Sequence, residues 1–168
     1  MNGALNRKRL ILDAGGGTTD YGGNVGLDVI PGTEGTVRKA AYDIAGVARD
    51  HIQARYPGLQ VSVLDVLAAM DMPDPTVFRA GEPVSVRQEL IHAADLITVS
   101  VLTDITPRWE AHLSQAEVCL AGGTAAWMLP TIRREYAGVA IRLLEHAIYR
   151  VLLGLERLGR HKLRAQER

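Results

Sequence analysis

Cysteine and net charge are what this sequence most clearly lacks. Cys119 is the single cysteine among 168 residues, so the chain can form neither an intramolecular disulfide nor a zinc site built from cysteines. The 19 basic and 19 acidic side chains cancel when the histidines are neutral. A net charge of zero excludes strong whole-chain attraction to nucleic acid or to acidic membranes as the main activity.

Long apolar runs are also missing. No stretch approaches the ~18 consecutive apolar residues that a membrane-spanning helix needs. The apolar residues 10–14, which follow a basic N-terminus, are too few for a signal peptide. We therefore expect a cytoplasmic protein without a membrane partner. The length and the 47% apolar composition fit one compact domain or two small subdomains.

Glycine, in contrast, is plentiful and unevenly placed. Eight of the 17 glycines lie between Gly15 and Gly35. Glycine is used where the backbone approaches a ligand closely or adopts a conformation that other residues avoid. We therefore expect the chemistry of this protein to lie near the N-terminus.

The order of apolar segments and glycines predicts alternating strands and helices. Residues 9–14 are an apolar run stopped by glycines, which is typical of a buried strand. Apolar side chains three or four residues apart predict an amphipathic helix over 37–55, with Thr36 as its N-cap. The other predicted elements are a hairpin of 18–23 and 26–30, a helix over 63–70, a small hairpin over 76–86, a helix over 87–113 with a break or kink near Pro107, a strand over 116–121, a helix over 124–136, a short strand over 139–141 and a final helix over 144–158.

The sharpest motif directly follows the first predicted strand. It reads Asp13-Ala14-Gly15-Gly16-Gly17-Thr18-Thr19-Asp20. Three consecutive glycines allow positive φ, so successive N–H groups can point into one concavity and bind phosphate oxygens. Thr18 and Thr19 add hydroxyl donors, and Asp13 is placed to hold Mg²⁺ through water or to orient a nucleophilic water. The same residues are also compatible with a glycine-rich hairpin turn in which the aspartate accepts from turn amides.

A second glycine motif follows the predicted strand over 116–121. Gly122, Gly123 and Thr124 end that strand and open a helix, which lets a flat ring approach the backbone beside Trp127. A tight strand–helix junction with Trp127 in the core is the alternative interpretation. Neither G-x-x-x-x-G-K-[ST] nor a G-x-G-x-x-G that opens a helix occurs, so neither a Walker nor a Rossmann site is predicted.

Together the two motifs resemble those of the actin-like ATPase superfamily, which includes actin, the sugar kinases, the Hsp70 chaperones and bacterial filament proteins. In that superfamily the first motif is the second phosphate loop and the other is the adenosine loop. The layout of Gly35-Thr36, Gly81-Glu82 and the long helix over 88–113 is similar to that of plasmid-segregation ParM/StbA-type and archaeal actin-like proteins. Residues 145–154 resemble the closing helix of that family, so the resemblance covers residues 9–159.

The resemblance implies an α/β fold. A ribonuclease-H-like nucleotide-binding subdomain would comprise residues 9–35 and 113–159, with a mainly helical lobe inserted over 36–112 and a basic tail over 160–168. The implied ligand is ATP or ADP with Mg²⁺. Asp13 would hold the Mg²⁺ or position the water, Gly15, Gly16, Gly17 and Thr18 would contact the phosphates, and Gly122, Gly123 and Thr124 would bind the adenosine. Trp127 would lie near the nucleotide.

The departures from the family are as informative as the matches. The chain begins just before the second phosphate loop, so it looks like the C-terminal half of a ParM/StbA-type ATPase. The family's first phosphate loop and water-activating residue have no counterpart in it, and we expect little ATP hydrolysis by the chain alone. Expected partners are nucleotide, a separate N-terminal half or further copies in a filament, and a DNA-binding adaptor for plasmid segregation. Two alternatives to this function remain open. The chain could be a sugar-kinase or chaperone-type relative, or it could be a non-catalytic nucleotide-binding regulator.

Overall fold

The computed structural model describes residues 7–144, which form one six-stranded sheet, a separate hairpin and four helices. Apart from Leu144, the predicted final helix and the basic tail lie outside the described residues. The sheet contains β1 (Lys8–Ala14), β2 (Thr19–Val25), β3 (Asp28–Val29), β4 (Gly35–Val37), β7 (Glu117–Ala121) and β8 (Ala140–Leu143). The other elements are α1 (Ala41–Arg55), α2 (Val63–Met70), the hairpin of β5 (Thr76–Arg79) and β6 (Glu82–Ser85), α3 (Arg87–Leu113) and α4 (Ala125–Glu135).

Strand β1 lies at the centre of the sheet and determines where the glycine motifs lie. It pairs antiparallel with β2 and parallel with β7, and β7 pairs parallel with β8. Parallel strands end at the same edge of a sheet, and the register places Asp13 beside Ala121. The two glycine motifs, which follow Ala14 and Ala121, therefore begin side by side although about a hundred residues separate them.

The core lies on one face of this sheet. Leu10 and Leu12 of β1 are fully buried there, as the alternation of a strand requires. Trp109 of α3 is fully buried too, and its indole Nε1 donates to the carbonyl of Thr33 at 2.9 Å. Its ring meets Tyr21 of β2 edge to face, with centroids 5.9 Å apart. These contacts hold the second half of α3 against the sheet.

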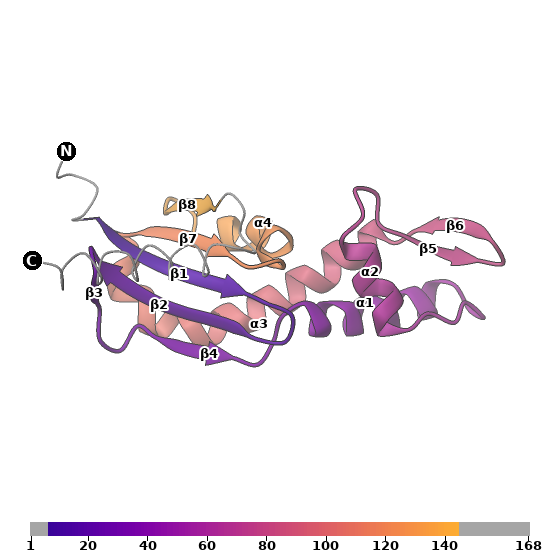
Figure 1. Ribbon diagram of the computed structural model, residues 1–168, viewed down its shortest axis with the longest axis horizontal. Coiled ribbons are helices and arrows are strands. Elements are labelled where there is room, and N and C mark those ends of the chain that lie inside the picture. The colour runs from indigo at the N-terminus through magenta and orange to yellow at the C-terminus, as the bar shows by residue number, and fades with distance from the viewer. Residues whose placement is uncertain (1–6, 145–168) are drawn as a thin grey trace, which may run out of the picture.

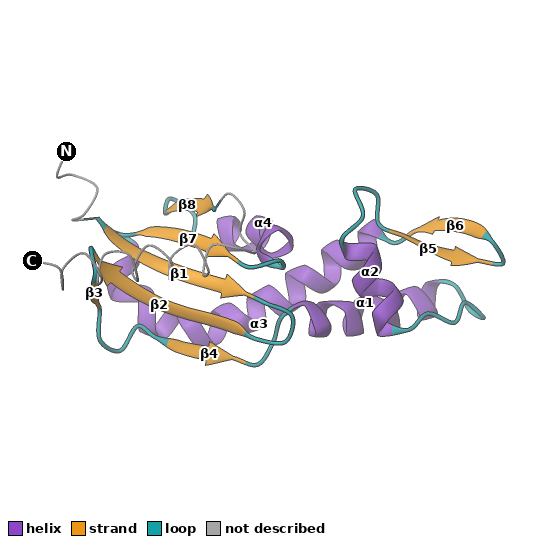
Figure 2. Cartoon of the chain, in the orientation of Figure 1, coloured by secondary structure: helices purple, strands orange, loops and turns teal. Residues whose placement is uncertain are grey.

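The first half of α3 extends beyond the sheet. There it packs with α1, which also contacts α2, and these helices and the β5–β6 hairpin form the right-hand part of the molecule (Figure 1; Figure 2). By length and composition α3 could cross a membrane, a test that the core helix of a water-soluble protein also passes. Leu90, Val101 and Ile105 of this helix are fully buried against other parts of the chain.

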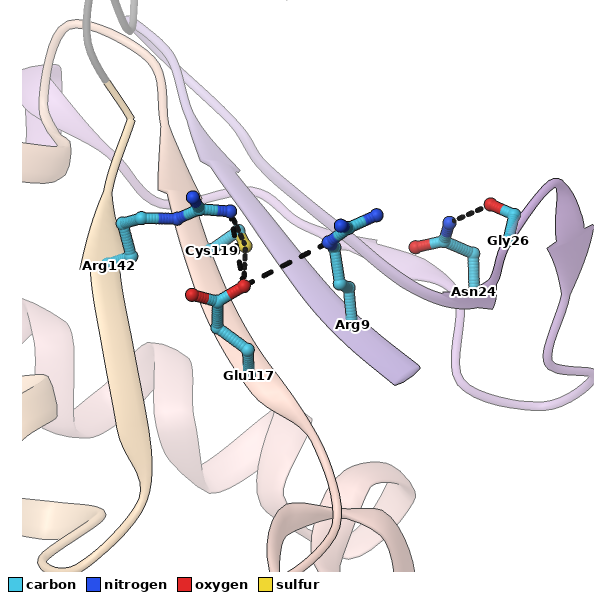
Figure 3. Close-up of polar contacts among 6 residues, drawn as sticks. All are labelled: Arg9, Asn24, Gly26, Glu117, Cys119 and Arg142. Atoms are coloured by element: carbon cyan, nitrogen blue, oxygen red, sulfur yellow. Dashed lines mark hydrogen bonds and ion pairs between the residues drawn. The ribbon is translucent and has the colours of Figure 1, made fainter. Parts of the chain in front are cut away.

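The opposite face of the sheet carries a polar cluster (Figure 3). Arg142 of β8 donates to the Glu117 carboxylate of β7 at 3.1 Å, and Arg9 of β1 lies 3.9 Å from the same carboxylate. Cys119 is 2% exposed beneath these side chains, and burial raises the pKa of its thiol.

One local prediction is wrong. Thr36 is not a helix N-cap: it lies in β4, which pairs with β2, and its hydroxyl donates to Asp20 Oδ1 at 2.5 Å. Helix α1 begins only at Ala41, because pairing with β2 takes Val37 into the sheet and so overrides the helical spacing. At Pro107, where a break or kink is predicted, α3 continues without a break to Leu113.

Candidate functional site

A cavity of about 480 Å³ lies where the two glycine motifs meet. One wall comes from the ends of β1 and β7 and from the start of α4, and the other comes from α2 and the start of α1. The residues that line it are Asp13, Gly15, Gly16, Ala41, Leu67, Ala68, Met70, Asp71, Gly122, Gly123, Thr124 and Trp127.

The second motif is joined to the first by close backbone contacts. Gly122 has a φ of +87°, and a Cβ built on it would overlap the carbonyl group of Ala14 and lie 2.6 Å from Asp13 Oδ1. The N–H of Thr124 donates to the Ala14 carbonyl at 3.1 Å, and its hydroxyl donates to the Gly15 carbonyl at 2.7 Å. Only glycine fits at position 122, because a Cβ would clash with Ala14 and because other residues rarely adopt a positive φ.

The loop of Gly15, Gly16, Gly17 and Thr18 turns its carbonyls and its amides in different directions. The Gly15 N–H donates to the Thr18 carbonyl at 2.9 Å and closes the β1–β2 connection. The Gly16 carbonyl accepts from the N–H of Tyr42 at 2.9 Å, at the start of α1. Within the described part of the chain, the N–H groups of Gly16, Gly17 and Thr18 have no hydrogen-bond partner. Three consecutive amides are thus available to an anion.

The conformation of this loop differs from the predicted one. None of its three glycines has a positive φ, whereas Gly26, Gly32 and Gly122 do. The short connection closes through the Gly15 amide without the left-handed conformation that the three glycines allow. The carbonyls of Gly15 and Gly16 accept from the first N–H groups of α1, and the N–H groups of Gly16, Gly17 and Thr18 are left available.

Seven of the predicted site residues line the cavity and three do not. Asp13, Gly15, Gly16, Gly122, Gly123, Thr124 and Trp127 lie together around it, and Gly17, Thr18 and Thr19 lie outside its lining. Thr19 is fully buried, and its hydroxyl donates to the Lys39 carbonyl at 2.8 Å. Thr18 is exposed, and its hydroxyl lies 3.4 Å from Asp20 Oδ2.

Asp13, near the end of β1, is one of two acidic residues that line the cavity, and Asp71 is the other. Burial raises the pKa of the Asp13 carboxyl above the ordinary value, and so does Asp20, which lies opposite it on β2. Asp20 is itself fixed by the hydroxyl of Thr36. Among the described residues no three His, Cys, Asp or Glu side chains form a metal-binding group. A cation here would therefore be held by Asp13 together with oxygens from a ligand or water.

We expect Asp13→Asn to stabilise the fold at about pH 7 and not at about pH 3. The pKa of Asp13 is higher in the folded than in the unfolded chain, so the folded state binds its proton more readily. Stability from this group is present below the unfolded pKa and is lost as the pH rises through the folded pKa. Asparagine cannot ionise and avoids that loss. Calorimetric unfolding at both pH values measures the effect, and an equal shift of Tm at both would contradict it.

The α2 wall is the part of the cavity that no sequence motif indicated. Leu67, Met70 and Asp71 belong to α2 or follow it directly, and tertiary packing brings them to the glycine motifs. The indole Nε1 of Trp127 lies 3.3 Å from the Met70 carbonyl and donates to it, which joins the two walls. Trp127 is half-buried, so it lines the cavity and also packs against the core.

The fold is that of one half of the actin-like proteins. An archaeal actin homologue in complex with ADP has a TM-score of 0.77 and 12% identity, covering 93% of this chain and 50% of that one. MreB 5 of Spiroplasma citri bound to AMPPNP has a TM-score of 0.71 and 15% identity, covering 99% and 57%. A ParM filament from Clostridium botulinum has a TM-score of 0.69 and 13% identity, covering 87% and 44%.

These likenesses confirm the predicted α/β, actin-like fold. The chain spans about half the length of each of these three solved structures. No model of a known protein family matches the sequence, and no curated protein matches it.

Proposed function

We propose that this chain is the C-terminal half of an actin-like, ParM/StbA-type ATPase that binds Mg-ATP or Mg-ADP in the cavity between the glycine motifs. It would act in the cytoplasm, in filament formation or in plasmid DNA segregation through a DNA-binding adaptor. The observation that supports this most is the cavity itself, where two separated glycine motifs and an aromatic side chain converge.

The residues around the cavity fit a nucleotide. The amides of Gly16, Gly17 and Thr18 suit phosphate oxygens. The half-buried indole of Trp127 and the apolar side chain of Leu67 suit a flat, largely apolar base. A volume of about 480 Å³ is within the usual range for small-molecule sites.

The same residues fit a magnesium ion only together with phosphate. Asp13 offers carboxylate oxygens, which Mg²⁺ prefers, and the ion usually completes its coordination with phosphate and water. A bound Mg²⁺ would neutralise phosphate charge. Its own charge would also offset the two causes that raise the pKa of Asp13, burial and the nearby Asp20.

The proposal also divides the chain into two parts. Residues 9–35 and 113–159 would form the nucleotide-binding subdomain and residues 36–112 the inserted lobe. The position of α1, α2 and the β5–β6 hairpin beyond the end of the sheet supports this division (Figure 2). Helix α3 links the two parts, because its buried Trp109 contacts the sheet and its first half contacts α1.

Titration calorimetry tests the nucleotide site. We expect Mg-ATP and Mg-ADP to bind the chain weakly, and Asp13→Asn to weaken binding at least about tenfold when Mg²⁺ is present. With EDTA in place of Mg²⁺, the variant and the unmodified chain should bind alike. Asp28→Asn, on the exposed β3, is the matched control and should change nothing. Absence of binding by the unmodified chain, or equal Mg-dependent binding by the Asp13 variant, would contradict the proposal.

A further inference from the structure

Two histidines face each other across the contact between α1 and α3, away from the nucleotide cavity. His51 of α1 and His92 of α3 lie ring against ring, with centroids 5.0 Å apart and ring planes inclined by 32°. His51 is partly exposed and His92 is exposed, so an ion in solution can reach both. Imidazole is the commonest metal ligand in proteins, so a pair that converges from two helices is a candidate metal site.

The packing of the two helices holds the pair in place. Arg55 lies one turn after His51 on α1, and Glu89 lies one turn before His92 on α3. Arg55 Nη1 donates to Glu89 Oε1 at 2.5 Å, and Glu89 is only 6% exposed. Residues three or four apart share one face of a helix, so the ion pair and the ring pair fix the same antiparallel register. Ile52, next to His51, is fully buried and anchors α1 beneath the imidazoles.

The separation of the rings fits a single ion. Zn²⁺ binds imidazole nitrogen at about 2.0–2.1 Å in tetrahedral geometry, which puts the centroids of two ligating rings roughly 5 Å apart. The centroids of His51 and His92 already have this separation. Imidazole suits zinc, copper and nickel, whereas Mg²⁺ prefers oxygen ligands. The pair would therefore distinguish Zn²⁺ from the Mg²⁺ that accompanies a nucleotide.

We propose that His51 and His92 bind a divalent transition-metal ion of the zinc type between α1 and α3. Among the described residues no three His, Cys, Asp or Glu side chains form a metal-binding group, so water or an outside ligand would complete the coordination. A hollow of about 440 Å³ between α3 and α4, which His92 lines, offers room for these ligands. Asp95 also lines it, and the Thr131 hydroxyl at 2.8 Å and Arg134 at 2.7 Å hold its carboxylate.

The ion would join two helices that meet different parts of the molecule. Helix α1 begins at the first glycine motif, where the N–H of Tyr42 donates to the Gly16 carbonyl at 2.9 Å. Helix α3 reaches the sheet, where Trp109 is buried. An ion that binds only the folded chain stabilises it by mass action. The inference concerns the chain without nucleotide and does not depend on the proposed function.

Calorimetric titration and thermal unfolding with ZnCl₂ test the site, on the full chain without a histidine tag and without nucleotide. Zn²⁺ should bind the unmodified chain and raise its Tm at about pH 7.5, where imidazoles are mostly neutral. His51→Ala and His92→Ala should each weaken Zn²⁺ binding at least about tenfold, because even the loss of a group that only orients a metal ligand typically costs about 10–100-fold. Mg²⁺ in place of Zn²⁺ should not distinguish the variants from the unmodified chain.

His112→Ala, which removes a histidine from the last turn of the same helix, is the matched control and should bind Zn²⁺ like the unmodified chain. At about pH 5 the effect of Zn²⁺ should disappear, since a protonated imidazole cannot bind a metal. With EDTA, all the variants should show the circular dichroism of the unmodified chain, which checks that they are folded. Absence of any Zn²⁺ effect on the unmodified chain, or an equal effect on the double variant His51→Ala/His92→Ala, would overturn the proposal.

Discussion

Gly122→Ala is expected to destabilise the fold by about 2–6 kcal/mol, the sum of a conformational and a steric cost. Alanine is strained at the φ of +87° that this residue adopts. Its Cβ would also overlap the carbonyl of Ala14, which lies in the central strand and accepts a hydrogen bond from Thr124. Neither backbone can move without disturbing the β1–β7 pairing.

Gly138→Ala separates the two costs. Gly138 has a φ of +84°, and a Cβ there has no atom within 4 Å, so alanine should cost only about 1–2 kcal/mol of conformational strain. Urea unfolding followed by circular dichroism measures both variants. Equal destabilisation would mean that Gly122 does not touch the first glycine motif, and the description of the site would then be wrong.

The strands that carry the site could be predicted from the sequence because their signals are local. Residues 9–14 and 116–121 are short apolar runs that stop at glycines, and they became β1 and β7 with shifts of one residue. Their parallel pairing is not a local property. It was not predicted: the resemblance placed both strands in one α/β subdomain, and the structure shows that they pair directly.

The other features of the fold and of the site depend on tertiary contacts, which no local sequence pattern encodes. Strand β4 forms because β2 offers a partner to Val37, although the spacing of apolar residues indicated a helix. The α2 wall reaches the cavity through packing against α1 and through the Trp127 contact with Met70. Thr19 was predicted to donate to phosphate on the basis of its residue type. Strand alternation instead directs its side chain into the core.

The glycine loop shows how a plausible site can be predicted by an incorrect argument. The prediction was argued from the freedom of three consecutive glycines to adopt positive φ, and none of Gly15, Gly16 and Gly17 has a positive φ in the structure. Free amides are present nevertheless, because α1 begins beside the loop and its first N–H groups take up the loop carbonyls. The start of α1 could not be located correctly from the sequence, so this arrangement could not be foreseen either.

Gly16→Asp is expected to abolish most nucleotide binding while leaving the fold intact. A Cβ on Gly16 has no atom within 4 Å and its φ is not positive, so a side chain fits without strain. Gly16 lines the cavity and carries the first of the three free amides, so a carboxylate there would face the phosphates. Two unit charges 4 Å apart repel by about 1–4 kcal/mol, depending on how much water screens them. That repulsion lowers affinity between about fivefold and a thousandfold.

Gly16→Asn supplies the matched control, because asparagine has nearly the same shape as aspartate and carries no charge. Calorimetric titration with Mg-ADP should give a much smaller loss for the asparagine variant, and raising the salt concentration should narrow the difference between the two. Thermal unfolding of both variants should match that of the unmodified chain within about 0.5 kcal/mol. If both variants bind Mg-ADP as the unmodified chain does, the phosphates do not lie at this loop. A loss of equal size in both would point to steric exclusion instead of charge.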